Sequence, residues 1–297
     1  MNRYGSPRAP PHVMPPLALL VPATEAEALA ELASAAPGEV AVVAGGTDLL
    51  PDLDERRLEP HRLLSLRRLP WKAHAWDAGG LTIGSTEPLC ALEADAQLAR
   101  RLPALAQGIA AVGSEALRRQ ATVGGNLGRS APASDLTPVF LALDAEVELV
   151  GRAGARRLRV DRFLQASRAT ALGPGELIRS VRIPEARPSS AYRWQRVRPA
   201  HDISQIGVAL AYAPSDGRWR LSLGGVLPRP VLVPDAAAEL HGLRPAEREV
   251  AAAAEILSTH PGLVSDRRAS DEHRRRLAAV LCTRTVASAI SSDGGRR

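Results

Sequence analysis

Two short segments combine paired glycines with hydroxyl and carboxylate side chains, the composition of a phosphate-binding loop. The first, residues 42–49 (VVAGGTDL), contains Gly45 and Gly46 followed by Thr47 and Asp48. Paired glycines let successive backbone N–H groups converge on one point, because no side chain stands in the way. The usual ligand of such a concavity is a phosphate group.

The second segment repeats this composition. Residues 122–127 (TVGGNL) place Gly124 and Gly125 between a threonine and an asparagine, and Ser134 and Asp135 follow a few residues later. Two such loops together can grip the two phosphates of a dinucleotide, and Asp135 can accept hydrogen bonds from its ribose or adenine. We therefore interpret the pair of loops as a candidate dinucleotide site.

Each loop taken alone has a simpler explanation. A Gly-Gly pair after a strand is more often a tight turn than a ligand site. Neither loop has the GxGxxG pattern of a Rossmann fold or the lysine of a Walker P-loop. Composition and spacing by themselves therefore indicate a candidate nucleotide site and nothing more specific.

The elements that must position these loops mix strands and helices throughout the chain. Thr24 and Glu27 have the spacing of a capping box and predict the start of a helix. A further helical stretch opens at Thr86, and another helix is expected over 135–143. Hydrophobic patterning predicts strands at the following positions: 40–43, 63–66, 81–84, 121–126, 146–150, 156–160 and 177–183.

The last third of the chain has a different order of elements. Residues 187–190 (RPSS) have the composition of a linker. Strands are expected beyond it at 191–198, 204–213 and 218–225, and then helices at 234–242, 246–258 and 271–290. Strands followed by helices, after a mixed first part, predict an α+β protein with a domain boundary near residue 187.

Composition excludes several other classes of protein. The chain of 297 residues has a net charge of +6, but its basic residues are scattered along the sequence, so we expect no nucleic-acid partner. Cys90 and Cys282 are far apart and no CxxC or HExxH motif occurs, so we expect no metal site. No segment approaches the length of a membrane span, and we expect a cytoplasmic protein without membrane insertion.

At the two glycine loops, the sequence resembles the FAD-binding middle subunit of the xanthine dehydrogenase, carbon monoxide dehydrogenase and 4-hydroxybenzoyl-CoA reductase group. The family pattern AGGTDLL stands at 44–50, TxGGN at 122–126 and SDLxP at 134–138. The resemblance extends from about residue 13 to residue 290, and further matching segments are 81–85, 176–184, 196–203 and 223–226. Two glycine motifs in this order and at this spacing are specific to the family.

The resemblance implies a fold and a domain division. It implies a PCMH-type FAD-binding domain of two α+β subdomains over 13–186, after an N-terminus at 1–12 that we expect to be disordered. A smaller C-terminal domain, a three-stranded sheet with helices like that of the carbon monoxide dehydrogenase flavoprotein, would cover 190–290.

The resemblance also implies the residues that bind FAD. Two of them, Tyr192 and Arg193, fall where the family places an aromatic and a basic residue near the flavin. The basic position aligns with Arg193 or with Trp194, depending on a one-residue gap, and Val112 stands where xanthine dehydrogenases carry an aromatic residue. The implied cofactor-binding set is Val42, Val43, Ala44, Gly45, Gly46, Thr47, Asp48, Leu49, Thr122, Gly124, Gly125, Asn126, Ser134, Asp135, Ile178, Tyr192 and Arg193.

The function that follows is electron transfer within a molybdenum hydroxylase complex. A molybdopterin subunit would oxidise the substrate, a [2Fe–2S] subunit would carry the electrons, and FAD on this chain would deliver them to NAD, a quinone or another acceptor. No catalytic acid–base residue is assigned. The alternative is a self-sufficient flavin-dependent oxidase or monooxygenase on the same FAD scaffold. A basic binding module that has lost its cofactor is disfavoured, because such a module needs neither glycine loop.

Overall fold

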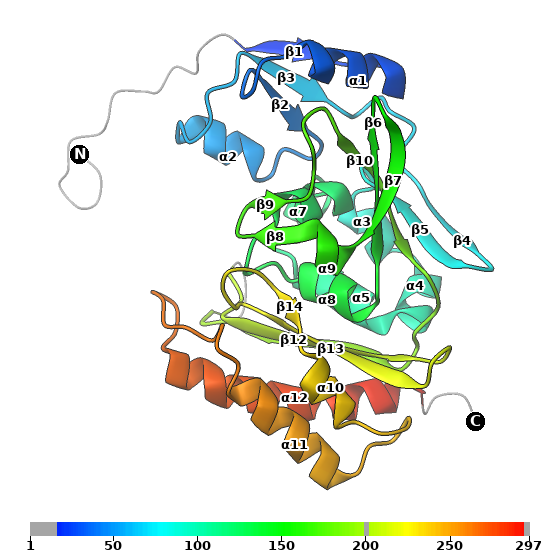
Figure 1. Ribbon diagram of the computed structural model, residues 1–297, viewed down its shortest axis with the longest axis vertical. Coiled ribbons are helices and arrows are strands. Elements are labelled where there is room, and N and C mark those ends of the chain that lie inside the picture. The colour runs from blue at the N-terminus through cyan, green and yellow to red at the C-terminus, as the bar shows by residue number, and fades with distance from the viewer. Residues whose placement is uncertain (1–16, 199–201, 294–297) are drawn as a thin grey trace, which may run out of the picture.

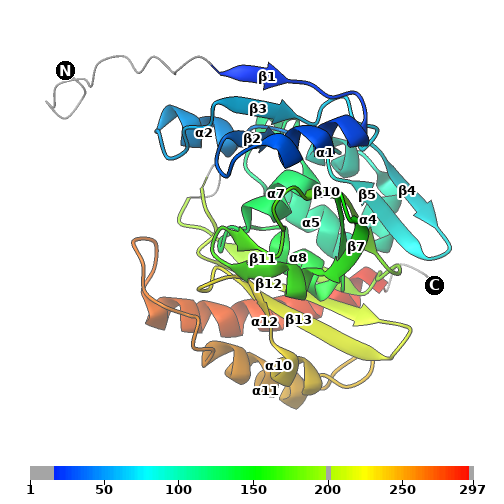
Figure 2. The same cartoon turned by 45° about the horizontal axis from the view of Figure 1, so that its top comes forward.

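The computed structural model describes residues 17–198 and 202–293 and shows three parts stacked along the long axis of the molecule (Figure 1). The first two parts, which end with residue 183, make up more than half of the molecule. The third part is a sheet with helices on its far side (Figure 2). The disorder expected for residues 1–12 lies outside the described residues.

The first part is a small parallel sheet with strand order β1-β3-β2. Its first helix begins with the expected capping box, in which the Thr24 hydroxyl accepts from the Glu27 N–H and the Glu27 carboxylate accepts from the Thr24 N–H. The prediction of this helix start is therefore confirmed. The elements are β1 (Ala18–Leu20), α1 (Glu25–Ser34), β2 (Val40–Val43), α2 (Leu49–Asp54) and β3 (Arg62–Ser65).

The second part is an antiparallel sheet of five strands, in the order β4-β5-β10-β6-β7, with short helices packed against it. Its strands are β4 (His74–Asp77), β5 (Gly80–Gly84), β6 (Glu146–Gly151), β7 (Gly154–Arg159) and β10 (Leu177–Ile183). Its helices are α3 (Leu89–Glu93), α4 (Ala96–Arg101), α5 (Pro103–Ala111), α6 (Glu115–Arg118), α7 (Val123–Arg129), α8 (Thr137–Ala142) and α9 (Val160–Phe163). A small hairpin, β8 (Leu164–Ala166) and β9 (Ala169–Thr170), lies beside them.

The third part is an antiparallel sheet between two helical layers. Helices α5 and α8 of the second part pack on one face, and α10, α11 and α12 cover the other. Side chains alternate along β12: Ala209 and Ala211 join the core of the second part, while Val208 and Leu210 face the C-terminal helices. The elements are β11 (Ser190–Gln195), β12 (Ile206–Ala213), β13 (Arg218–Gly224), β14 (Val231–Leu232), α10 (Pro234–Ala238), α11 (Glu247–Ser258) and α12 (Asp271–Asp293).

The α+β fold class is confirmed, although several short elements, among them β1, β4, β8 and β9, were not expected. Residues 121–126, expected as a strand, make one isolated bridge between Thr122 and Pro88 and then begin helix α7. The C-terminal sheet also has a fourth strand, β14, whose two residues are too few to give a sequence pattern. No helix in the described part of the chain is long and apolar enough to cross a membrane.

Candidate functional site

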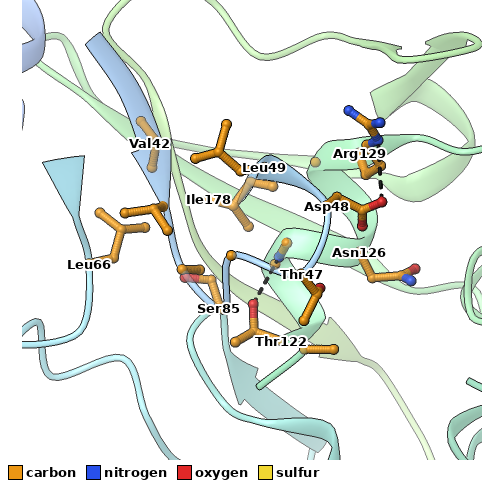
Figure 3. A pocket seen from close by; sticks show the side chains of 18 of the residues that line it. Val42, Thr47, Asp48, Leu49, Leu66, Ser85, Thr122, Asn126, Arg129 and Ile178 are labelled. Carbon is orange, nitrogen blue, oxygen red and sulfur yellow. Dashed lines mark hydrogen bonds and ion pairs between the residues drawn. The ribbon is translucent and has the colours of Figure 1, made fainter. Parts of the chain in front are cut away.

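A cavity of about 310 Å³ lies between the first part of the molecule and the second. One wall is residues 42–49, the end of β2 and the loop into α2, and the other includes helix α7. Figure 3 shows apolar side chains on one side of the cavity, including Val42, Leu66 and Ile178, and the polar Asp48 and Arg129 on the other. The cavity thus suits a ligand with an apolar portion and a charged portion.

The first loop offers free backbone donors to a ligand. Among the described residues, the N–H groups of 45–48 have no hydrogen-bond partner, and the loop runs directly into the N-terminus of α2. Gly46 has a φ of +73°, a conformation that favours glycine. Unpaired N–H groups at a turn before a helix form an anion-binding concavity, so this wall suits a phosphate.

The second loop is the first turn of helix α7. The Thr122 hydroxyl accepts from the Gly125 N–H at 3.1 Å and caps the helix. The N–H groups of Val123 and Gly124 donate to the backbone of the segment before α3, at Glu87 and Ser85. These two donors are therefore already paired within the protein. Helix α7 contributes to the cavity mainly through its glycines, which have no side chains to fill the space.

Close backbone contact holds the two loops together. A Cβ added to Gly45 would lie 1.8 Å from the carbonyl oxygen of Gln120, just before α7. A Cβ added to Gly125 would meet the Thr122 Oγ1 at 3.0 Å and no other atom within 4 Å. Gly45 is thus required for the contact between the loops, whereas Gly125 leaves space open in the cavity.

An ion pair joins the same two walls. Arg129, at the end of α7, lines the cavity and contacts both Asp52 and Asp48 of the first part. Its Nη1 and Nη2 donate to the two carboxylate oxygens of Asp52 at 2.5 and 3.2 Å. Asp52 is buried, and the hydrogen bonds from Arg129, followed by those from Arg57, lower the pKa of its carboxyl against the opposing effect of burial.

Most of the residues expected to bind FAD meet at this cavity. The lining includes Val42, Val43, Ala44, Gly45, Gly46, Thr47, Asp48, Leu49, Thr122, Gly124, Gly125, Asn126 and Ile178, together with Val112. Ser134 lies just behind it, where its hydroxyl donates to Asn126 Oδ1 at 2.8 Å. The structure therefore brings the two glycine motifs together, although 77 residues separate Gly46 and Val123 in the sequence.

Besides Ser134, three expected residues lie outside the lining. The buried carboxylate of Asp135 accepts from Tyr192 at 2.8 Å, Ser204 at 2.6 Å and Arg196 at 2.8 Å, and its burial raises its pKa. Burial, followed by the charge of Asp135, raises the pKa of Tyr192 well above its usual value. Arg193 donates to Ser288 of α12 at 2.7 Å. A contact of these residues with FAD stays a prediction.

The two residues that could occupy the expected basic position, Arg193 and Trp194, lie beside Tyr192 on strand β11. Trp194 stacks on Tyr192 with ring centroids 5.4 Å apart, so it contributes an aromatic side chain and no charge. Arg193 and Arg196 are the neighbouring guanidinium groups, and Arg196 is the one that reaches Asp135. This cluster joins the C-terminal sheet to the loop before α8.

Sequence reasoning missed several residues of the lining: Leu66, Ser85, Leu117, Ala121, Gly128, Arg129, Leu172 and Leu177. Arg129 was the most informative omission. Had Thr122 been interpreted as a helix cap, positions 125, 126 and 129 would have fallen on one helical face at spacings of three and four residues. The side chains of Leu117 and Leu172 are more than one-third exposed at this cavity, as expected where a ligand covers apolar surface.

Family models match nearly the whole chain. The model described as the FAD binding domain in molybdopterin dehydrogenase matches residues 15–186. The model described as the CO dehydrogenase flavoprotein C-terminal domain matches residues 190–289. The resemblance drawn from the two glycine motifs is therefore confirmed.

Individual relatives agree with the family models. The chain is 29% identical over 252 residues to the carbon monoxide dehydrogenase medium chain of Afipia carboxidovorans, covering 82% of this chain and 86% of that one. It is 27% identical over 267 residues to the xanthine dehydrogenase FAD-binding subunit of Escherichia coli O157:H7, covering 86% and 90%. A chain of the solved quinoline 2-oxidoreductase from Pseudomonas putida 86 superimposes with a TM-score of 0.86 at 26% identity, covering 94% and 99%.

Proposed function

This chain belongs to the family of FAD-binding subunits of molybdopterin dehydrogenases, and we propose that it relays electrons from a [2Fe–2S] subunit to an external acceptor. FAD is its cofactor, and the family consists of oxidoreductase subunits. The proposal concerns the route of the electrons and the residues that hold the cofactor.

The observation that carries the proposal is the fit of the cavity to FAD. The free N–H groups of 45–48 suit the pyrophosphate, and Gly125 leaves the opposite wall without a side chain. The apolar side chains beside them suit the adenine or flavin rings. We assign the cavity-lining members of the expected set to FAD binding: residues 42–49, Thr122, Gly124, Gly125, Asn126 and Ile178.

The cavity lacks the groups that independent substrate chemistry needs. Its lining contains no histidine, cysteine, lysine or tyrosine, and its charged side chains, Asp48 and Arg129, lie 3.6 Å apart. A general base or a nucleophile with its activating partner is the usual mark of a site that transforms substrate. The described residues also contain no group of three or more potential metal ligands. This favours a subunit that binds a redox cofactor over a self-sufficient oxidase or monooxygenase.

The names of the relatives support a complex with partner subunits. Those relatives are a medium chain of carbon monoxide dehydrogenase and an FAD-binding subunit of xanthine dehydrogenase, and the chain covers at least 86% of each. We propose that this chain likewise assembles with a [2Fe–2S] subunit and a molybdopterin subunit. NAD, a quinone or another oxidant would be the final acceptor.

The chain's own contribution is to bind and orient the cofactor. FAD, when bound, supplies the reversible acceptance of electrons. The first loop would hold the pyrophosphate through backbone donors, and the apolar side chains would exclude water from the rings. The cluster around Asp135 would hold the C-terminal sheet against the FAD-binding domain.

Reduction of the purified chain with and without its partners tests the proposal. The chain should be co-expressed with candidate [2Fe–2S] and molybdopterin subunits, and the bound flavin followed by stopped-flow absorbance. We expect the flavin to be bleached by substrate only in the assembled complex. A chain that by itself oxidises an organic substrate and reduces oxygen would refute the relay and favour the self-sufficient enzyme.

A further inference from the structure

The ion pair between Asp52 and Arg129 joins the first part of the molecule to the second beside the cavity. Asp52 lies in the first turn of α2, which follows the loop with the free N–H groups. Arg129 is the last residue of α7, and 77 residues separate the pair in sequence. The pair is thus a polar link between the first and second parts of the molecule at the cavity.

The Asp52–Arg129 pair is largely buried and has a bidentate geometry. The Asp52 side chain is 3% exposed and that of Arg129 20%, and both Arg129 Nη atoms donate to Asp52. Arg57 donates to the same carboxylate at 3.0 Å, so Asp52 lies between two guanidinium groups. A bidentate pair fixes the relative orientation of its two elements more tightly than a single hydrogen bond does. Breaking it would leave a charge in a poorly solvated place.

Helix α2 needs an external constraint of this kind. It has six residues, and its N-cap residue Asp48 makes no side-chain capping bond. A helix this short has little stability of its own, so tertiary contacts must fix its direction. The orientation of α2 in turn fixes the N–H groups of 45–48, because the loop continues directly into the helix.

Arg129 is itself held from the opposite side. Its neighbour Ser130 is fully buried in a left-handed conformation with φ of +47°. The Ser130 hydroxyl donates to the Ala166 carbonyl at 3.0 Å, and its own carbonyl accepts from the Arg168 N–H at 3.0 Å. The β8–β9 hairpin therefore fixes the end of α7, and Arg129 transmits that position to α2.

We propose that Asp52 and Arg129 are positioning residues for FAD, which hold the first glycine loop in its phosphate-binding geometry without contacting the cofactor. This inference rests on the proposal that the cavity holds FAD, and it does not depend on the electron relay. The competing role for Arg129 is a direct contact with the pyrophosphate. The two roles predict opposite effects of removing the charge of Asp52.

Titration of the apo-protein with FAD, followed by flavin fluorescence, distinguishes these roles in the full-length chain. We expect Asp52→Asn and Arg129→Gln each to raise the dissociation constant by about tenfold, equivalent to 1.4 kcal/mol. The double variant should bind about as weakly as either single variant, because both remove one interaction. Arg129→Lys keeps the charge without the bidentate geometry and should give a smaller but measurable loss.

A matched control is available at the pair between Glu25 of α1 and Arg179 of β10. This pair is also bidentate, at 2.8 and 2.5 Å, and it joins the same two parts of the molecule away from the cavity lining. Glu25→Gln should leave FAD affinity within about twofold of wild type while lowering the thermal midpoint of the apo-protein. The control therefore separates positioning of the loop from general loss of stability.

Several results would overturn the inference. If Asp52→Asn binds FAD as tightly as wild type or more tightly, while Arg129→Gln binds weakly, Arg129 is a direct phosphate ligand. Additive losses in the double variant, or an equal loss in Glu25→Gln, would also contradict a specific positioning role. If Asp52→Asn does not fold by circular dichroism, Arg129→Lys decides, and wild-type affinity in that variant refutes the proposal. Absence of FAD binding by the wild-type chain would instead refute the site assignment itself.

Discussion

Alanine substitutions at Gly45 and Gly125 should separate loop packing from cofactor binding, although both glycines belong to similar motifs. The ideal Cβ at position 45 lies 1.8 Å from the Gln120 oxygen, whereas a normal C···O contact is about 3.3 Å. The loops must then separate by the difference, 3.3 − 1.8, or about 1.5 Å. Forcing a methyl group into such a contact costs about 3 kcal/mol, the upper end of the usual range for overpacking.

Gly125→Ala should behave differently. Its new Cβ would meet only Thr122 Oγ1, at 3.0 Å, and would project into the cavity that Gly125 lines. Alanine in a helix is favoured over glycine by about 0.5–1 kcal/mol, which offsets the tight contact. We expect near wild-type stability but FAD affinity about tenfold weaker, because the methyl group occupies space beside the pyrophosphate.

Two measurements on each apo-variant test this difference. Thermal unfolding should show Gly45→Ala lowered by at least about 6 °C, at roughly 2 °C per kcal/mol for a chain of this size, and Gly125→Ala nearly unchanged. Titration with FAD should show a clear loss for Gly125→Ala. A stable Gly45→Ala protein would refute the close contact between the loops, and wild-type FAD affinity in Gly125→Ala would show that the phosphates do not approach α7.

Three further predictions concern buried groups. Tyr192→Phe removes the donor to Asp135 and should lower the free energy of unfolding by about 1–3 kcal/mol in urea titrations; unchanged FAD affinity would show that Tyr192 has no contact with the cofactor. The lowered pKa of Asp52 means that its stabilisation is present above the unfolded-state pKa of about 4 and is lost as the pH falls through the folded-state value. The stability difference between wild type and Asp52→Asn should therefore shrink on acidification below about pH 4, and a constant difference would show that ionised Asp52 does not stabilise the fold. Burial raises the pKa of Cys282 to about 12, so its thiol should react with Ellman's reagent at pH 8 only after denaturation. Cys282→Ser is the control, and rapid labelling of Cys282 in the native protein would contradict its burial.

The sequence determined the two glycine loops, the family and the α+β class, because these depend on local composition. Paired glycines indicate close backbone approach wherever they occur, and two such motifs in fixed order are specific. The capping box at Thr24 and Glu27 was equally readable, since both of its hydrogen bonds lie within four residues. Hydrophobic patterning likewise gave most strands of the larger sheets within a few residues.

Short elements were less predictable because local patterns are ambiguous there. Residues 121–126 begin with a strand-like pattern that ends at Gly124 and Gly125, yet Thr122 caps a helix whose first N–H groups donate to Ser85 and Glu87. Those acceptors come from a segment more than 30 residues earlier in the chain. Whether a six-residue segment becomes strand or helix thus depends on partners that a local window does not contain.

Only the tertiary structure decided how the two walls of the cavity are held together and which charged side chains form pairs. Asp52 and Arg129 are unremarkable in sequence, and their pairing arises because the first part of the molecule packs beside α7. The same applies to Asp135, whose motif suggested a ligand contact. Its carboxylate instead accepts hydrogen bonds from three residues of the C-terminal part: Tyr192, Ser204 and Arg196. Interactions between charged groups depend on distance and burial, and residue order alone specifies neither.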